Sequence, residues 1–211
     1  MTGEYEFTSK IYDPFLFVFL RGVRRRVTRA LSPFRDRPVL DLCCGTGAQL
    51  KHLARAGHTD LTGVDLDPHM LAVARRGPHA LTLLERDATA TGLAAGSFDA
   101  VILSLALHEK PPATRAALLA EAHRLLSAGG VLLVVDFAID ARTWPPAAAG
   151  ITVVERLAGR EHYRNYRDFR RRGGLAPLLT PDRWRPLPVD PAVGDDRALF
   201  GGLALSRYGR V

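Results

Sequence analysis

The stretch that decides the fold is VLDLCCGTG, residues 39–47. A short run, Val-Leu-Asp-Leu, is followed at once by a turn of small residues, and a helical pattern covers residues 46–56. Glycines in such a turn leave the backbone open to a ligand, because they have no side chain to block the approach. The order strand, turn and helix therefore predicts an α/β sheet that binds a ligand at the carboxyl end of its first strand.

The same alternation continues along the chain. Apolar runs over residues 60–64, 81–84, 98–104 and 131–135 predict four more strands, and amphipathic stretches between them predict helices. The run 131–135 is apolar on both faces, which is typical of a central parallel strand. Strands that alternate with helices predict a mostly parallel sheet with helices on both faces.

Three segments lie outside this alternation. Residues 12–31 predict an amphipathic helix before the first strand. After the fifth predicted strand, a Pro/Ala-rich stretch at 144–150 precedes two predicted helices, 151–158 and 161–172. The C-terminal part, 185–208, predicts two more strands, and its prolines make the first of these an edge or irregular strand.

The composition is that of an ordinary globular protein, with 47% apolar and 24% charged residues among 211. The longest apolar run, residues 15–20, is too short to span a bilayer, and no signal-peptide pattern is evident at the start. The two cysteines, Cys43 and Cys44, are adjacent and cannot form a disulfide that stabilises the fold. A reducing, cytoplasmic location is therefore expected. The net charge is +7, and most of the basic residues are arginines. The arginines occur in clusters, and the simplest interpretation is that each cluster forms a solvated helix face.

Acidic residues recur at the ends of the predicted strands. Asp65 stands 20 positions after Gly45, where a carboxylate can accept hydrogen bonds from the two hydroxyls of a ribose. The alternative for an acid there is a helix N-cap, and Asp67 fits that role better. Asp87 follows the third predicted strand, next to the small Ala88. An adenosine ligand would find an acceptor at each of these places.

A dinucleotide site needs a third small residue after the turn for close helix packing, and Leu50 stands there instead. The pattern therefore favours a ligand with an ammonium group and no pyrophosphate.

These stretches together resemble the motifs of class I S-adenosylmethionine-dependent methyltransferases, in the type 11, quinone-biosynthesis-like branch. The resemblance is collinear over about residues 37–137 and is carried by VLDLCCGTG (39–47), GVDLDPHML (63–71), ERDA (85–88), GSFDAV (96–101) and EAHRLLSAGG (121–130). In one departure, Cys43 replaces the first glycine of the usual turn. Because cysteine disfavours a positive φ, we expect a slightly altered turn there.

The resemblance implies a seven-stranded, mostly parallel Rossmann-like sheet with an antiparallel last strand and helices on both faces. It also implies helical lid segments at the N-terminus and after the fifth strand. We expect one methyltransferase domain over residues 1–211, with the following parts: an N-terminal helical cap (1–36), a cofactor-binding core (37–137), a substrate lid insertion (138–182) and C-terminal strands (183–211).

The cofactor that the resemblance implies is S-adenosyl-L-methionine, released as S-adenosyl-L-homocysteine. The residues expected to bind it are Tyr12, Asp41, Cys43, Gly45, Gly47, Asp65, Leu66, Asp87, Ala88 and Ser104. In this assignment Asp41 and the turn hold the methionine part, Asp65 and Leu66 flank the ribose, and Asp87 and Ala88 flank the adenine. Ser104 faces the sulfonium, and Tyr12 closes over the cofactor.

His108, just past the fourth predicted strand, is the predicted catalytic residue, because an imidazole titrates in the range useful for a general base. The alternative roles for His108 are to shape the pocket or to cap the helix that follows. Tyr163 and Tyr166 are predicted to bind the substrate together with His108. The alternative for the face that holds Tyr166 is simple packing onto the sheet. No Cys or His partner at metal-ligand spacing accompanies the cysteines, so we expect no metal site.

The sequence therefore predicts a methyltransferase that acts on O, N or C of a small molecule, and its aromatic and arginine-rich lid suits a flat, even anionic, acceptor. One alternative is a non-catalytic cofactor-binding partner or regulatory subunit with the same fold. Another is a membrane-surface, quinone-type C-methyltransferase that uses residues 12–31 as an amphipathic anchor. A nucleic-acid acceptor is disfavoured, because residues 104–107 lack the Pro-Pro element that holds an exocyclic amine in related enzymes. The acceptor and the oligomeric state stay open.

Overall fold

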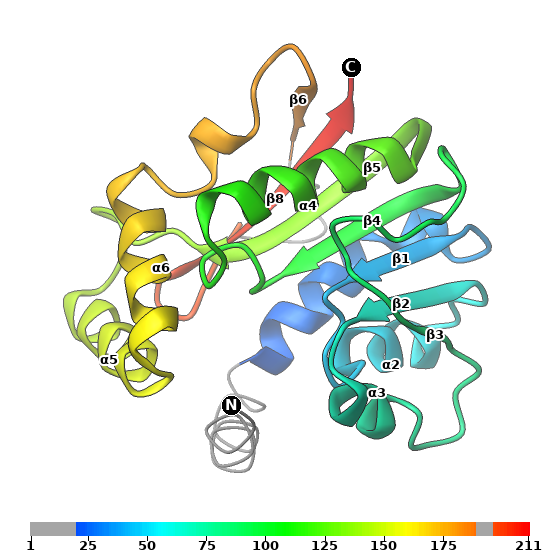
Figure 1. The fold of residues 1–211 in the computed structure, drawn as a ribbon, viewed down its shortest axis with the longest axis horizontal. Helices are drawn as coiled ribbons and strands as arrows, with labels where there is room; N and C mark the ends of the chain where they lie inside the picture. Colours follow the sequence, from blue (N-terminus) through cyan, green and yellow to red (C-terminus); the bar gives the residue numbers. More distant parts are fainter. Residues whose placement is uncertain (1–19, 189–195) are drawn as a thin grey trace.

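The computed structural model describes residues 20–188 and 196–211 (Figure 1). Its strands are β1 (Val39–Leu42), β2 (Leu61–Asp65), β3 (Thr82–Glu85), β4 (Phe98–Ser104), β5 (Leu126–Phe137), β6 (Trp184–Leu187), β7 (Arg197–Ala198) and β8 (Leu203–Arg210). Its helices are residues 20–30, α2 (Ala48–Arg55), α3 (Pro68–Ala74), α4 (Pro112–Leu125), α5 (Pro145–Leu157) and α6 (Arg160–Arg171), with 3-10 turns η1 (Ser32–Phe34) and η2 (Ala176–Leu178). Tyr12 and the first part of the predicted helix 12–31 lie outside the described residues.

The strands form one sheet in the order β3-β2-β1-β4-β5-β8-β6, with β7 paired to β8 (Figure 1). From β3 to β5 all neighbours are parallel, whereas β8 is antiparallel to β5, β6 and β7. The predicted mostly parallel sheet with an antiparallel last strand is thus confirmed. The two-residue β7 is the one strand without a sequence signal, because so short a run shows no periodicity.

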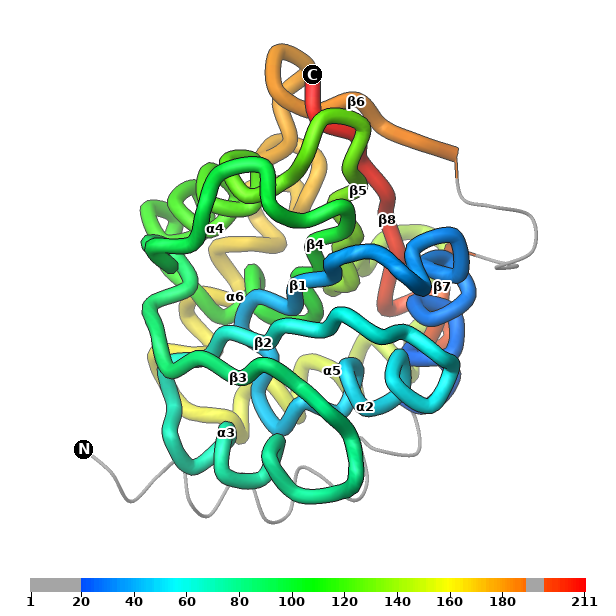
Figure 2. Tube along the Cα trace, turned by 90° about the vertical axis from the view of Figure 1, so that its right-hand side faces the viewer, coloured from blue at the N-terminus to red at the C-terminus, as the bar shows by residue number. Residues whose placement is uncertain are grey.

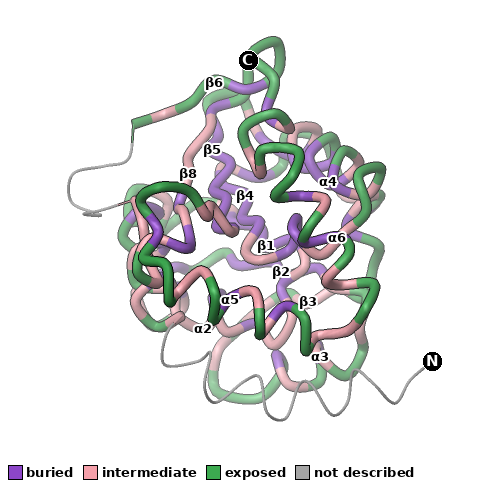
Figure 3. The backbone as a smooth tube through the Cα atoms, turned by 90° about the vertical axis from the view of Figure 1, so that its left-hand side faces the viewer, coloured by how far each residue is buried: buried purple, intermediate pink, exposed green. Residues whose placement is uncertain are grey.

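Helices lie on both faces of the sheet (Figure 2), and alternate residues of the strands pack against the two helical layers. Leu40 and Leu42 belong to the apolar cluster that contains the buried side of α4 and Phe169 of α6. Val39, which precedes them in β1, belongs to the cluster on the other face of the sheet, formed with α2 and the helix over residues 20–30. Buried residues therefore follow the central strands (Figure 3), and both faces of the sheet are covered. Within the described residues, no helix is long and apolar enough to cross a membrane.

Two predicted boundaries differ from the structure. The fifth strand, predicted over residues 131–135, begins at Leu126 directly after α4, so Gly129 and Gly130 lie within β5. The Pro/Ala-rich stretch 144–150, expected before a helix, instead supplies the first turns of α5. Prolines are accepted in a first helical turn, where the missing N–H would have had no intrahelical partner.

The cap of α3 agrees with the sequence. The Asp67 side chain accepts hydrogen bonds from the backbone N–H groups of His69 and Met70, at 2.8 and 3.4 Å. Asp67 is thus the N-cap, and the carboxylate of Asp65 is left for other partners.

Gly63 in β2 is a position where the sheet and α2 approach too closely for a side chain. A Cβ there would lie 2.7 Å from Leu50 and 2.8 Å from the Cys44 sulfur. Gly63→Ala should therefore lower the free energy of unfolding by about 1–3 kcal/mol through overpacking, as measured by urea denaturation. The control is Gly150→Ala in α5, where a Cβ meets no atom within 4 Å. It should be neutral or stabilising, and equal stability of both variants would contradict this account.

Candidate active site

Three cavities lie side by side at the carboxyl ends of the parallel strands, and Leu105 lines all of them. The turn cavity, of about 230 Å³, contains Asp41 and the turn at residues 43–46. The wide cavity, of about 670 Å³, extends from Cys43 past Asp65 to Asp87. The apolar cavity, of about 330 Å³, is lined by α5 and the start of α6. The cavities surround the carboxyl end of β1, which has β2 on one side and β4 on the other. The strand order reverses at this position, and ligands usually bind there in such sheets.

The turn after β1 has three residues in the left-handed region. Their φ angles are +62° at Cys43, +52° at Gly45 and +65° at Gly47. The expected alteration at Cys43 is therefore wrong, because the cysteine adopts the conformation that a glycine would favour. That conformation costs a non-glycine residue about 1–2 kcal/mol. Burial raises the pKa of the Cys43 thiol to about 12, which suits a packing group and not a nucleophile.

Asp41 is a buried carboxyl with an unused oxygen. Only 2% of the residue is exposed, and its Oδ1 has no hydrogen-bond partner among the residues that the structure describes. Burial, assisted by the nearby Asp65 and opposed by Arg24, raises the pKa of Asp41 to about 8. A buried carboxylate is costly unless a cation or several donors pair with it. Asp41 therefore marks the turn cavity as a place for a ligand with a positively charged donor.

Asp65 ties the turn to the next helix. Its Oδ2 accepts a hydrogen bond from the Gly45 N–H at 2.7 Å, and its Oδ1 accepts one from the Asp67 N–H at 2.9 Å. The carboxylate also lines the wide cavity, where its remaining lone pairs are available to a ligand. Asp65 thus holds the shape of the turn as well as offering acceptors.

Most residues predicted to bind the cofactor lie around the wide cavity. Its lining includes Cys43, Gly45, Asp65, Leu66, Asp87, Ala88 and Ser104. One oxygen of Asp87 accepts from the N–H and hydroxyl of Thr89, and these bonds lower the pKa of Asp87. Gly47 does not line the cavities. It lets α2 approach α3, since a Cβ there would lie 3.0 Å from the Cβ of Ala74. Tyr12 lies outside the described residues.

His108 lies in the loop after β4 and is fixed by Asp136 at the end of β5. Asp136 Oδ2 accepts from the backbone N–H groups of Leu107 and His108, at 3.0 and 3.3 Å. Its Oδ1 lies 2.8 Å from Nδ1 of the His108 ring. This geometry assigns the Nδ1 proton to the Asp136 contact and turns Nε2 away from it. Burial disfavours the charged ring, but the carboxylates of Asp136 and Glu155 raise the pKa of His108 overall.

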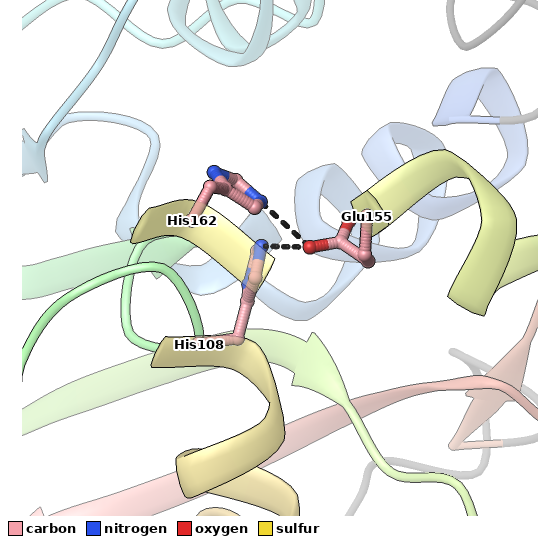
Figure 4. Close-up of side chains that lie close together, drawn as sticks. All are labelled: His108, Glu155 and His162. Atoms are coloured by element: carbon pink, nitrogen blue, oxygen red, sulfur yellow. Dashed lines mark hydrogen bonds and ion pairs between the residues drawn. The ribbon is translucent and has the colours of Figure 1, made fainter. Parts of the chain in front are cut away.

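Glu155 of α5 stands between two histidines (Figure 4). Its Oε2 lies 2.6 Å from Nε2 of His162 and 3.6 Å from Nε2 of His108. All three side chains line the apolar cavity, next to Glu109. The sequence reasoning missed Asp136 and Glu155. An acid at the end of the fifth strand was the available signal for Asp136, and nothing in the pattern of α5 distinguishes Glu155.

The structure does not bring Tyr163 and Tyr166, the predicted substrate-binding residues, to the cavities described above. Tyr166 is fully buried, with its ring centroid 5.5 Å from that of Phe137. Tyr163 stacks on Tyr166, with centroids 6.2 Å apart, and neither tyrosine lines any of the three cavities. The alternative, packing of this helix face onto the sheet, explains both Tyr166 and Phe169. His162, one turn earlier, is the residue of α6 that reaches the cavity.

The apolar cavity has polar groups at one end only. Its other lining residues are Leu20, Leu105, Phe137, Trp144, Pro146, Ala147, Gly150, Ile151, Val154, Leu199, Phe200 and Leu203. None of the described arginines lines it, and its titratable groups are two glutamates and two histidines. The expectation of an anionic acceptor is therefore not supported, whereas a flat apolar molecule fits these walls.

Comparison with known proteins agrees with this arrangement. A family model described as a methyltransferase domain matches residues 39–130. A demethylmenaquinone methyltransferase of Beutenbergia cavernae is 35% identical over 153 residues, covering 71% of this chain and 62% of the relative. An aklanonic acid methyltransferase of a Streptomyces species is 28% identical over 193 residues, covering 88% and 79%.

Among solved structures, the plantazolicin methyltransferase BpumL, in complex with a triazolic desmethylPZN analogue and SAH, has a TM-score of 0.69 at 16% identity. The alignment covers 99% of this chain and 92% of that one, and it shows the shared fold. The chain spans between 54% and 62% of the length of several curated methyltransferases that it matches. The matched domain, the collinear motifs and the sheet order agree, and together they support a class I S-adenosylmethionine-dependent methyltransferase.

Proposed function

We propose that this chain transfers a methyl group from S-adenosylmethionine to a small, largely apolar acceptor. The observation that carries the proposal is the buried Oδ1 of Asp41 at the turn after β1, which has no hydrogen-bond partner within residues 20–188 and 196–211. It lies in a cavity that shares Ser104 and Leu105 with the wide cavity, and Leu105 also lines the apolar cavity. A cofactor and an acceptor placed in these cavities would meet near Leu105.

The residues present fit the cofactor. The Asp41 carboxylate suits its ammonium group, and a Cβ at Gly45 would meet no atom within 4 Å, so the backbone there is open to a ligand. Asp65 and Asp87 offer acceptors to hydroxyls and an amine along the wide cavity. Among the described residues that line that cavity, Lys110 is the one basic side chain, and it pairs with Glu109 at 2.7 Å. A pyrophosphate would find little charge compensation there.

The bound cofactor would supply the methyl group together with its own leaving group. The task left to this chain is alignment in a site that excludes water. Leu105, with φ +57°, turns the backbone sharply after β4, and its N–H donates to the carbonyl of Val135 at 2.7 Å. This turn brings His108 to the acceptor side, where its Nε2 can hold or accept a proton from an acceptor hydroxyl.

For the acceptor we propose an aromatic hydroxy compound or hydroxyquinone. The apolar cavity supplies flat walls such as Phe137 and Trp144, and its single polar end suits one hydroxyl group. The match to a demethylmenaquinone methyltransferase supports the same class. The test is release of S-adenosylhomocysteine with a panel of naphthols, hydroxynaphthoquinones and aromatic amines. Cofactor binding without release for any of them would overturn methyl transfer and favour the non-catalytic alternative.

The binding assignment is tested at Asp65. Asp65→Ala removes a ligand acceptor and two hydrogen bonds that shape the turn, so S-adenosylmethionine should bind at least about 10-fold more weakly in calorimetry. The matched control is Asp60→Ala, an exposed acid just before the other end of β2, which should leave the affinity unchanged. Equal affinity in Asp65→Ala and the wild type would place the cofactor elsewhere.

A further inference from the structure

The cluster formed by His108, Glu155 and His162 has no role in holding the cofactor. We propose that these three side chains bind a divalent transition-metal ion, with Zn²⁺ as the first candidate. The sequence predicts no metal site, because the three residues come from the loop after β4, from α5 and from α6. Only the fold brings them together (Figure 4).

The distances suit a metal ion. One ligand atom from each residue can be chosen so that all of them lie within 4.8 Å of one another. Zinc binds nitrogen and oxygen at about 2.0–2.2 Å, so neighbouring ligand atoms around a tetrahedral ion lie about 3.4 Å apart. His108 Nε2 and Glu155 Oε2 are already 3.6 Å apart. The 2.6 Å contact between Glu155 and His162 has to open by less than about 1 Å, which side-chain rotation alone can provide.

The surroundings of the cluster are those of a metal centre. His108 gives its Nδ1 side to the Asp136 carboxylate at 2.8 Å, which orients the ring and leaves Nε2 as the lone-pair donor. On the other histidine, Nδ1 of His162 lies 3.6 Å from Glu109 Oε2. Ligating histidines commonly have such a carboxylate on the nitrogen that does not bind the metal. His108 therefore has the outer partner that a metal site needs, and Glu109 lies close enough to supply one to His162.

Charge and burial also favour an ion. The side chains of His108 and Glu155 are only 5% and 2% exposed, and that of His162 is 16% exposed. Two electron-rich atoms, Nε2 of His108 and Oε2 of Glu155, face each other in this enclosed space. Such a pair is stable only if a proton or a cation lies between them. Two imidazoles and one carboxylate form a donor set that Zn²⁺ and Fe²⁺ accept.

Three protein ligands leave one coordination position open, and all three residues border the apolar cavity. Metal binding itself does not depend on the proposed methyl transfer. If both hold, the open position is where an acceptor oxygen would bind, and His108 then serves as a ligand in place of a base.

The test is equilibrium dialysis of chelator-treated full-length protein against Zn²⁺, with Co²⁺ as a spectroscopic substitute. The wild type should bind one equivalent saturably, and bound Co²⁺ should show visible absorption bands of a low-coordinate site. Glu155→Gln and His162→Ala should each weaken binding at least about 10-fold, and Asp136→Asn about 10- to 100-fold. The control is His79→Ala, in the loop before β3, which should bind like the wild type.

Absence of saturable binding in the wild type would overturn the proposal, and the cluster would then hold protons only. Retention of wild-type affinity in both Glu155→Gln and His162→Ala would also overturn it. Because His162 is the least buried of the three, its alanine variant is the safest to fold, as circular dichroism would verify. S-adenosylmethionine affinity, measured separately in metal-free protein, distinguishes failure of this proposal from failure of the proposed function.

Discussion

Asp41→Asn is expected to weaken S-adenosylmethionine binding at least about 100-fold, or about 3 kcal/mol. The physical reason is that the Asp41 carboxylate is the buried acid proposed to pair with the cofactor ammonium, and its Oδ1 has no other partner among the described residues. An amide of the same shape keeps the packing but removes the charge, and truncating one partner of a desolvated charge pair commonly costs 2–5 kcal/mol. Titration calorimetry on both proteins measures the difference.

The variant should fold at least as well as the wild type. A neutral amide buries no ionisable group, whereas the wild-type carboxyl has to take up a proton on folding at neutral pH because burial raises its pKa to about 8. Asp60→Asn, at the opposite end of the sheet, is the matched control for the general loss of one acid. An affinity within about threefold of the wild type for Asp41→Asn would refute the proposed ammonium contact.

The same carboxyl gives cofactor binding a pH signature. Free Asp41, with its folded-state pKa near 8, has to lose its proton to pair with an ammonium, so affinity should rise as the pH increases towards 8. Stability of the free protein should change in the opposite direction. The stability that Asp41 contributes is fully present below the pKa of this group in the unfolded chain, and it is lost as the pH rises through 8. Calorimetry in buffers of different ionisation enthalpy should detect proton release with the wild type and none with Asp41→Asn.

Local sequence signals predicted the cofactor side of the molecule well. β1 and β4 have the predicted bounds, and Asp67 caps α3 as the pattern indicated. These features depend on neighbours within a few residues, so periodicity and capping chemistry suffice to find them. The conformation of Cys43 was harder to predict, because the surrounding turn imposes a positive φ that a cysteine by itself disfavours.

The acceptor side was predicted poorly, because contacts between distant residues determine it. His162 and Tyr166 are one helical turn apart, yet one reaches the cavity and the other is fully buried. The difference depends on how α5 packs against α6, which no periodic pattern in either helix encodes. Glu155 faces two histidines for the same reason. The start of β5 was also predicted too late, at residue 131, whereas the strand begins at Leu126.

Arg115→Leu is expected to lower the free energy of unfolding by about 3–5 kcal/mol, the cost of breaking a buried charged network. Arg115 is 1% exposed on α4 and donates in three directions. Its Nε reaches the carbonyl of Leu107 at 2.9 Å, and its Nη1 reaches the Asp168 carboxylate at 2.8 Å. Its Nη2 reaches the carbonyl of Asn165 at 2.5 Å. Leucine fills much of the volume but removes the guanidinium donors from the carbonyls of Leu107 and Asn165 and from the Asp168 carboxylate.

The control shares one partner with this network. Arg172 binds the same Asp168 at 2.8 Å but is 62% exposed, so Arg172→Leu should cost no more than about 1 kcal/mol in urea denaturation. Arg115→Lys should recover little, because an ammonium on a flexible stem cannot reproduce the planar fork that reaches the loop before α4 and α6 together. Since that loop carries His108 and α6 carries His162, a large loss in Arg115→Leu would show that one arginine holds both sides of the proposed acceptor site. Losses of equal size in the Arg115 and Arg172 variants would mean that apolar packing alone positions α6, and the three hydrogen bonds would then contribute little.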